Sequence, residues 1–185
     1  MSMPSLSRLS MSPDHGWPEL ARERPSLAKV FAFLVLPLSL LPPLMLYYAG
    51  THHPEVFPGT AGAKDWAWIA LVFFLAELGT LAMMGWLIRQ LAETSGLAID
   101  YHDAYLLASI APVPMWLSAL GLLVPSLPFN VVVSLAATGV SCALVHRGIE
   151  GLGRTREDVT AASITQIVIG MGLVAWALLL VVALI

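Results

Sequence analysis

The fold of this chain is decided by the stretch Trp66-Ala-Trp-Ile-Ala-Leu-Val-Phe-Phe-Leu-Ala-Glu77-Leu-Gly-Thr-Leu-Ala-Met-Met-Gly-Trp-Leu-Ile88. These 23 residues contain one ionisable side chain, and Asp65 and Arg89 bound them on either side. A helix of this length, at about 1.5 Å per residue, crosses a hydrocarbon core about 30 Å thick. We therefore expect residues 66–88 to form a transmembrane helix.

Glu77 lies at the centre of this predicted span, eleven residues from either end. An ionised carboxylate at such a depth costs about 2.5–3.5 kcal/mol on insertion scales. Because no Lys or Arg lies deep within a predicted span, we expect an uncharged carboxyl that donates a hydrogen bond. The expected partners are Thr80, a backbone carbonyl that a proline frees near Leu38 or Ala108, or the hydroxyl of Thr138.

The composition of the whole chain agrees with a membrane protein. It is 58% hydrophobic and 11% charged, whereas about 25% of the residues of a soluble domain are charged. This apolar fraction exceeds what a water-soluble core could bury, so we expect the lipid bilayer to cover much of the surface. The formal net charge of −3 does not indicate a nucleic-acid partner.

The sequence does not indicate a metal site or a cofactor. Cys142 is the single cysteine, so neither an intrachain disulfide nor a site of paired thiolates can form. His52 and His53 are adjacent, and neighbouring residues on a helix or strand point in different directions. A metal site at this pair is the minor interpretation, and we expect no cofactor.

Four further apolar segments predict transmembrane helices at about residues 28–48, 101–124, 129–145 and 159–185. The predicted fold is therefore an all-α polytopic membrane protein, a bundle of five transmembrane helices. Residues 1–27 are polar and read as a cytoplasmic leader. Within this leader the sequence leaves two possibilities open, a short helix over 17–24 that lies at the membrane interface, or a disordered tail.

Prolines interrupt the first and third predicted spans. The first span carries Pro37, Pro42 and Pro43, and the third carries Pro112 and Pro114. Each proline removes a backbone donor and clashes with the preceding turn, so a kink or break is expected in both helices, near Leu41 in the first. Neighbouring spans must then satisfy the freed carbonyl groups.

The fourth predicted span carries small polar side chains at a regular interval. Asn130, Ser134, Thr138, Cys142 and His146 recur every four residues, which places them along one ridge of the helix. Such a ridge is expected to face protein, where small polar side chains allow close helix packing and hydrogen bonds between helices. A polar pathway through the bundle is the alternative interpretation.

The third span begins with Asp100-Tyr-His-Asp103, in which Asp100 is suited to cap the helix and Asp103 adds negative charge to its first turn. We interpret His102 and Asp103 as capping and interface residues. A membrane enzyme that uses Glu77, His102 and Asp103 is disfavoured, because Glu77 lies in mid-membrane and the other two at its edge. Trp116, deeper in the span, is expected to be a packing residue.

The distribution of Lys and Arg predicts the orientation. Eight of the nine basic residues fall in the leader, at the start of the first span (Lys29) or in alternate connections, and Lys64 alone falls on the other side. Because Lys and Arg are enriched in cytoplasmic loops, the N-terminus is expected in the cytoplasm and residue 185 on the opposite face.

The segment Asp103-Ala-Tyr105-Leu-Leu-Ala-Ser-Ile-Ala-Pro112-Val-Pro114, followed by an aliphatic run that ends in Val124-Pro125, resembles the corresponding segment of the Yip family of small five-span membrane proteins. The resemblance extends over the five-span layout from about residue 25 onward. It implies a five-helix bundle with a cytoplasmic N-terminus and adds Tyr105 to the candidate interface residues. Eukaryotic members act in Golgi and endoplasmic reticulum traffic and bind Rab-type GTPases. With its short leader, this chain is more similar to short bacterial members, which implies the bacterial inner membrane.

Two functions follow from these observations. The first is a non-enzymatic scaffold or partner-binding unit that associates with itself or with other membrane proteins, because no predicted loop is long enough to hold a soluble substrate. The alternative is a proton-coupled transporter or permeation unit in which Glu77 titrates and the broken spans supply free backbone groups. The candidate functional residues are Glu77, Thr80, Pro112, Pro114 and Thr138.

Overall fold

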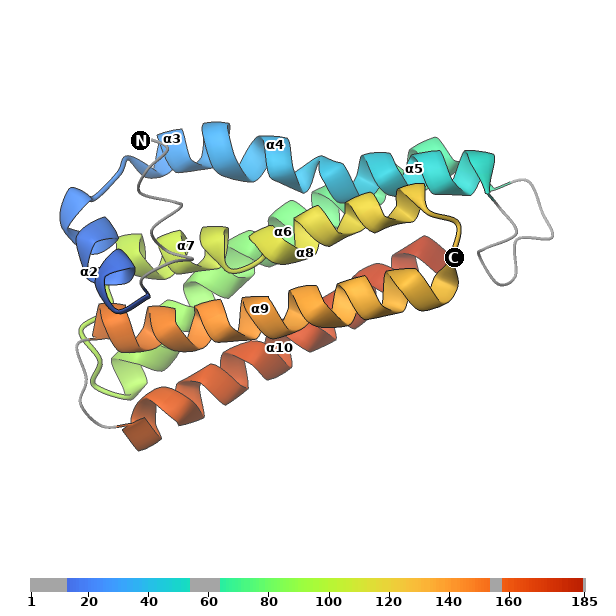
Figure 1. Ribbon diagram of the computed structural model, residues 1–185. Helices are drawn as coiled ribbons and strands as arrows, with labels where there is room; N and C mark the ends of the chain where they lie inside the picture. Colours follow the sequence, from blue (N-terminus) through green and yellow to red (C-terminus); the bar gives the residue numbers. More distant parts are fainter. Residues whose placement is uncertain (1–12, 54–63, 154–157, 185) are drawn as a thin grey trace.

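The computed structural model describes residues 13–53, 64–153 and 158–184, and in these ranges the regular secondary structure is entirely helical. Residues 1–12 of the predicted leader, the connections at 54–63 and 154–157, and residue 185 of the fifth predicted span lie outside the described part. Five helical segments are long and apolar enough to span a membrane, which confirms the predicted fold class. Figure 1 shows them packed side by side, with a short helix across one end.

The elements follow one another in the order of the predicted spans. The short helix is α2 (Pro13–Glu23), and the first span consists of α3 (Leu27–Val30), η1 (Phe31–Val35), α4 (Leu36–Ser39) and α5 (Leu41–His52). The second span is α6 (Trp66–Thr94), and the third consists of α7 (Tyr101–Ile110), α8 (Val113–Ser118) and η3 (Ala119–Leu123). The last two are α9 (Leu127–Gly153) and α10 (Asp158–Leu184).

The first span is interrupted where the prolines predict it. One turn of π-helix, η1, precedes Pro37, and a turn at Leu40 separates α4 from α5. The backbone at Leu40 stays in the right-handed helical region, with φ −75° and ψ −20°. The interruption is therefore local, and the helices from α3 to α5 follow one another as one rod along the bundle in Figure 1.

The third span breaks at Ala111 and Pro112, between α7 and α8. The Ala111 amide still donates to the Leu107 carbonyl at 2.9 Å, and the Trp116 amide donates to the Pro112 carbonyl at 3.0 Å. Prolines at 112 and 114 have no amide to donate between these two bonds. The helical ladder is thus missing its donors at the predicted place, and α8 lies against both α4 and α5.

Two predicted spans are shorter than the helices that form. The prediction ended the second span at residue 88 and the fourth at 145, where charged side chains begin, whereas α6 continues to Thr94 and α9 to Gly153. Charged side chains mark the edge of the lipid but do not stop a helix, because the backbone hydrogen bonds continue in water. The extra turns of α9 carry Ile149 and Leu152, which are buried under α2.

The placement of α2 corrects the prediction for residues 17–24. The side chains of Trp17 and Leu20 are 0% and 2% exposed and belong to the main hydrophobic cluster, so they pack against protein and not against lipid. The Trp17 ring lies over Gly148 of α9, where an added Cβ would come within 3.2 Å of it and would overlap Leu107. Glycine at 148 therefore makes room for both side chains.

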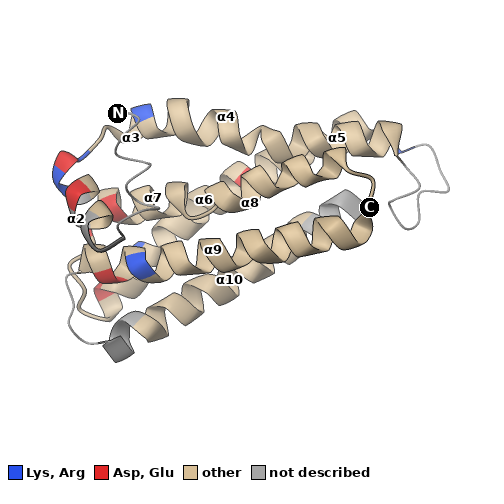
Figure 2. Ribbon diagram, viewed as in Figure 1, with Lys and Arg blue, Asp and Glu red and all other residues tan. Residues whose placement is uncertain are grey.

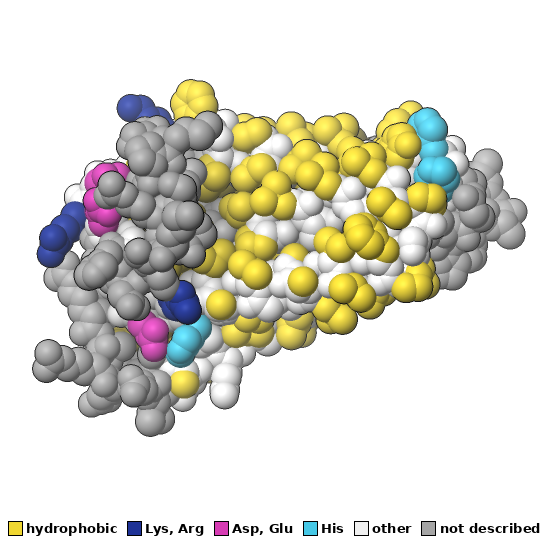
Figure 3. All heavy atoms as spheres, in the orientation of Figure 1, with side chains coloured by type: hydrophobic (Ala, Val, Ile, Leu, Met, Phe, Trp, Pro, Cys, Tyr) yellow, Lys and Arg dark blue, Asp and Glu magenta, His cyan; other side chains and the backbone are white. Residues whose placement is uncertain are grey.

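The surface divides along the axis of the bundle. Apolar side chains cover the middle in Figure 3, and large ones such as Phe33, Val132 and Leu135 are exposed to 81%, 66% and 66%. Lys, Arg, Asp and Glu gather around α2 at one end in Figure 2, which we call the charged end. A lipid bilayer covers an apolar belt of this kind, whereas exposure of so large an apolar surface to water would be unfavourable.

Candidate functional site

Glu77 is buried in the middle of the bundle, with 8% of its surface exposed. One turn further along α6, Leu81 packs with Val35 of η1 and Trp116 of α8 in a cluster of buried side chains. The glutamate thus lies where α6 faces the interrupted parts of the first and third spans. The site depends on both breaks, because each of them places one wall of this cluster.

The hydrogen-bond partner of Glu77 is the side chain of Trp116, and the indole N–H is the donor. The second carboxyl oxygen, Oε2, has no partner among the described residues. The sequence predicts Trp116 only as a packing residue, so its contact with Glu77 is a finding of the structure. The signal that could have found it is its position two residues after Pro114, at a depth similar to that of Glu77.

The partners predicted for Glu77 are wrong. The Thr80 hydroxyl donates to the Ala76 carbonyl of its own helix at 2.8 Å. The Thr138 hydroxyl is 2.8 Å from the Ser134 carbonyl and 3.3 Å from the Met115 sulfur. Threonine in a helix commonly bonds the carbonyl one turn back, and this local bond competes with contacts to other helices.

The five polar residues of α9 are all half-buried. The side-chain Nδ2 of Asn130 donates to the carbonyl groups of Val124 and Ser126, both at 3.0 Å. At the other end of the row, His146 Nδ1 lies 3.4 Å from the Thr165 hydroxyl of α10. Ser134 serves through its carbonyl, and Cys142 is a half-buried free thiol. The row therefore lies along contacts inside the bundle and not on its outer face.

A second group of polar residues lies at the charged end, where α7 begins. Asp100 caps the helix, as predicted, since its Oδ1 accepts from the Asp103 amide at 2.9 Å. Its other oxygen forms an ion pair with Arg24, which follows α2. His102 Nε2 is 2.9 Å from the Pro25 carbonyl, and its Nδ1 is 3.4 Å from Asp103 Oδ1.

Charge interactions perturb Asp100. Partial burial favours the neutral acid, but the Asp103 amide and the Arg24 guanidinium outweigh it and lower the pKa of Asp100. Ligand atoms of Asp100, His102 and Asp103 lie within 4.8 Å of one another. Because Arg24 already supplies a cation there and His102 Nε2 is bonded to Pro25, we do not assign a metal to this group.

The structure keeps Glu77 apart from His102 and Asp103. Gly85 of α6 is level with Tyr105 of α7, whose ring would lie 3.1 Å from an added Cβ. Glu77 lies eight residues before Gly85 on α6, which corresponds to about 12 Å of helix toward the middle of the bundle. The three residues therefore cannot form one catalytic site, as their predicted depths indicated.

The other predicted residues have local contacts. Tyr105 stacks on Tyr101 with 6.2 Å between ring centroids, and its carbonyl accepts from the Ser109 hydroxyl at 2.8 Å. At the opposite end of the bundle, the His52 ring stacks on Tyr48 at 4.5 Å, while His53 meets the same ring edge-on at 6.2 Å. Both histidines thus pack on one tyrosine.

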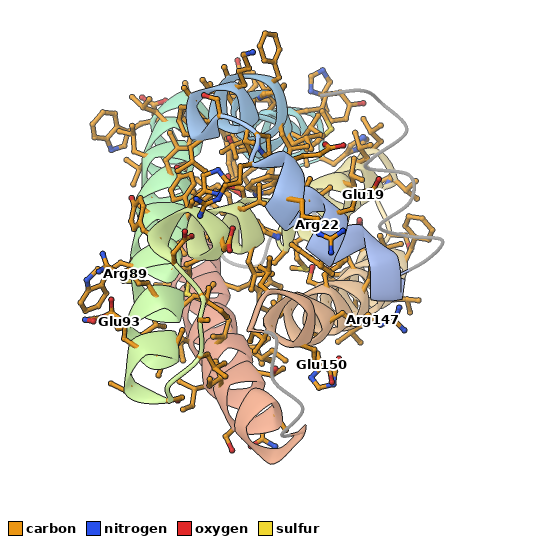
Figure 4. The ribbon with its side chains drawn as sticks, turned by 90° about the vertical axis from the view of Figure 1, so that its left-hand side faces the viewer. Glu19, Arg22, Arg89, Glu93, Arg147 and Glu150 are labelled. Carbon is orange, nitrogen blue, oxygen red and sulfur yellow. The ribbon has the colours of Figure 1, made fainter. Side chains whose placement is uncertain are left out.

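Figure 4 looks onto the charged end. It shows Glu19 and Arg22 on α2 near Arg147 and Glu150 on α9, with Arg89 and Glu93 apart from them on α6. Arg89 and Glu93 form an ion pair at 2.8 Å within one helix, and Glu150 lies 3.3 Å from His146. These two pairs are local, each within one helix, and their side chains are partly exposed.

Comparison of the sequence with models of protein families gave a match over most of the chain. The model of the Yip1 domain matches residues 8–183, which includes all five spans and α2. The chain belongs to the Yip1 family. In this Yip1 chain, α2 and the broken spans thus lie inside the matched domain. Neither the comparison with curated proteins nor the comparison with solved structures gave a match.

Proposed function

We propose that this Yip1 protein is a non-enzymatic membrane scaffold that associates with a second copy of itself through the outer face of α9. The observation that carries the proposal is the amount of α9 that the bundle leaves uncovered. Between Phe129 and Leu144 only Ala137 is buried. The described connections between spans are short, so the chain offers its helices as binding surfaces.

The outer face of α9 has the features of a helix-packing surface. Gly139 has no atom within 4 Å of an added Cβ, and Ala143, one turn on, is exposed. Val132, Leu135 and Val140 flank this pair and are 66%, 66% and 53% exposed. Small residues four apart let two helices approach closely in a membrane, which supports pairing in place of simple lipid contact.

The five polar residues predicted as interface candidates support the same face indirectly. Since Thr138 and His146 make their contacts to α8 and α10 within one chain, they are not free to bind a partner. The opposite side of α9 remains for association. We also propose that the protein resides in a bacterial inner membrane with its charged end in the cytoplasm, in agreement with the enrichment of Lys and Arg there.

Energy transfer between donor-labelled and acceptor-labelled copies in liposomes tests the scaffold. Transfer should rise with protein density and fall several-fold in Gly139→Leu, because a large side chain separates the helices. Gly79→Leu is the matched control, since Gly79 of α6 is equally open and should leave transfer unchanged. Equal transfer in wild type and Gly139→Leu would reject the proposed face, and transfer no higher than that of unrelated labelled helices would reject self-association.

A second function is favoured by one observation, the unpartnered Oε2 of Glu77. In this alternative the protein is a proton-coupled transporter or permeation unit, and the carboxyl binds and releases a proton. Two hollows of the described surface, of about 280 and 230 Å³, are lined mostly by apolar side chains, the first from α6 and α10, with Thr80 among them, and the second largely from α5 and α6. They do not provide an aqueous route to Glu77, which is why we rank this function second.

Proton flux into liposomes that contain a pH-sensitive dye distinguishes the two functions. If Glu77 carries protons, wild type should acidify the lumen under an imposed gradient and Glu77→Gln should not. If the protein is a scaffold, both should match empty liposomes, and Glu77→Gln should keep wild-type energy transfer between copies.

A further inference from the structure

The link between α2 and the first span has an unusual backbone. Arg24 has φ 41°, and it is the one non-glycine residue with positive φ among the described residues. Residues other than glycine rarely adopt this backbone conformation, which persists only when surrounding contacts hold it. The Arg24 amide donates to the Leu20 carbonyl at 3.2 Å, so the last turn of α2 closes just before the chain reverses.

Two contacts with α7 hold this link. The Arg24 guanidinium pairs with Asp100, and the Pro25 carbonyl lies 2.9 Å from Nε2 of His102. Both partners come from the start of α7, 76 and 77 residues further along the chain. The start of α7 therefore fixes the position of the segment that follows α2.

The two nitrogens of the His102 ring both face acceptors. A carbonyl oxygen only accepts, so Nε2 must carry a hydrogen toward Pro25. In the neutral ring, Nδ1 then presents a lone pair to Asp103 Oδ1, 3.4 Å away. In the doubly protonated ring, Nδ1–H donates to that carboxylate instead, a charge-assisted bond. The ring can therefore donate to both acceptors at once only when both of its nitrogens carry a hydrogen.

We propose that His102 is a proton-sensitive latch for α2. The protonated ring joins Asp103 to Pro25 and holds the strained link, so α2 stays against α9. The neutral ring has one N–H and can donate to Pro25 or to Asp103 but not to both. The bond to Pro25 is therefore made only part of the time, so the link loosens and α2 detaches more readily. Because histidine changes charge between about pH 5 and 8, the latch is tight in acid and loose in mild alkali.

The charged groups around the latch do not reverse this sign. Asp100 and Asp103 on α7 are both acidic, and the guanidinium of Arg24 is paired with Asp100. Since the pKa of Asp100 is lowered, this carboxylate keeps its charge throughout the range in which histidine titrates. The other described charged residues on the neighbouring helices near this end are Glu19, Arg22 and Glu23 on α2, Lys29 on α3, Arg89 and Glu93 on α6, and Arg147 and Glu150 on α9, where the titratable His146 lies beside Glu150.

Release of α2 has a defined consequence for the bundle. Trp17 and Leu20 are almost fully buried, and they cover Gly148 and the side chains around Ile149 and Leu107. Detachment exposes these apolar groups together. The movement of α2 is therefore a large change from the loss of one proton, and it should be visible to a probe on that helix.

A spin label on Glu23→Cys, in a Cys142→Ser background and in lipid nanodiscs, tests the latch. Glu23 is exposed at the end of α2, so the label reports the motion of the helix without disturbing its packing. The fraction of the mobile spectral component should rise several-fold between about pH 5.5 and about pH 8. A spectrum that does not change over this range would overturn the proposal.

Variants assign the response to His102. His102→Gln still offers a donor to Pro25 but cannot titrate, so its mobile fraction should be the same at both pH values. Asp103→Asn should also abolish the response while it keeps His102 and the cap at Asp100, and it serves if His102→Gln does not fold. The matched control is His146→Gln, at the same end of the bundle, which should respond like the parent. A full response in both His102→Gln and Asp103→Asn would overturn the latch.

Discussion

Among single residues, Glu77 combines deep burial with a contact to the Trp116 side chain and with one oxygen, Oε2, that has no partner among the described residues. A buried polar atom without a partner costs about 1–3 kcal/mol. The Trp116 indole offsets part of this cost at the other oxygen. The packing of the rest of the bundle must therefore offset the remaining cost of burying Glu77. The contribution of its contact with Trp116 should be measurable in the free energy of unfolding.

Trp116→Phe should lower the free energy of unfolding by about 1–3 kcal/mol, because the ring still packs but no longer donates to Glu77. Glu77→Gln should change it by less than about 1 kcal/mol, since glutamine keeps an acceptor for the indole. The measurement is unfolding in mixed micelles, completed by the double variant. The cycle uses Glu77→Met, which removes the acceptor, so additive effects of Glu77→Met and Trp116→Phe would show that the two residues do not interact.

Asp100 should make the stability of the protein depend on pH in the acid range. Its pKa is lower in the folded protein than in the unfolded chain, so its contribution is present above about pH 4 and is lost as the pH falls through the folded pKa. The difference in unfolding midpoint between wild type and Asp100→Asn should therefore shrink below about pH 4. Asp65→Asn, at the cap of α6, is the control for a general effect of a cap substitution. A difference that stays constant down to about pH 2 would contradict the role of Asp100.

How much could be predicted at this scale depends on whether a partner is local. Glu77 and the cap at Asp100 follow from the sequence, because span length and helix start signals are local. The partner of Glu77 does not, since it depends on where the break in the third span places Trp116. The hydroxyl groups of Thr80 and Thr138 illustrate the same limit, because bonds within their own helices take precedence.

At the scale of elements, the broken spans follow from their prolines. Missing amide donors are a property of the sequence, and the breaks occur at Leu40 and at Ala111 and Pro112. The π-helical turn η1 could not be predicted, because its residues have ordinary helix propensity and packing selects the wider turn. The place of α2 was also missed, since an amphipathic helix suits either a membrane interface or a protein surface.

Replacing both prolines of the third span tests the role of the break. In Pro112→Ala/Pro114→Ala two donors return, so α7 and α8 should merge into one helix and turn Trp116 away from Glu77. Hydrogen exchange over residues 108–116 in nanodiscs should become slower, and the additional Trp116→Phe substitution should lose its cost. Pro125→Ala, in the connection before α9, is the control and should leave exchange over 108–116 unchanged. Unchanged exchange in the double variant would show that the break does not depend on these prolines.

At the scale of the whole molecule, five apolar spans and one charged end form a single pattern. The described Lys and Arg residues at that end come from α2, the first span, α6 and α9, and Lys64 lies at the other end. Each crossing of the membrane reverses the side on which the next connection lies. The grouping of basic residues therefore depends on an even number of spans between the leader and each of the two basic connections, those after α6 and after α9.

Topology is the property that tests this account most directly. A fluorescent protein that folds only in the cytoplasm and a phosphatase that is active only outside it should be fused in turn after His53, Ser95, Gly153 and Ile185. The account predicts fluorescence after Ser95 and Gly153, and phosphatase activity after His53 and Ile185. Fluorescence after both Gly153 and Ile185, or the reverse pattern at all four positions, would contradict five spans with the charged end in the cytoplasm.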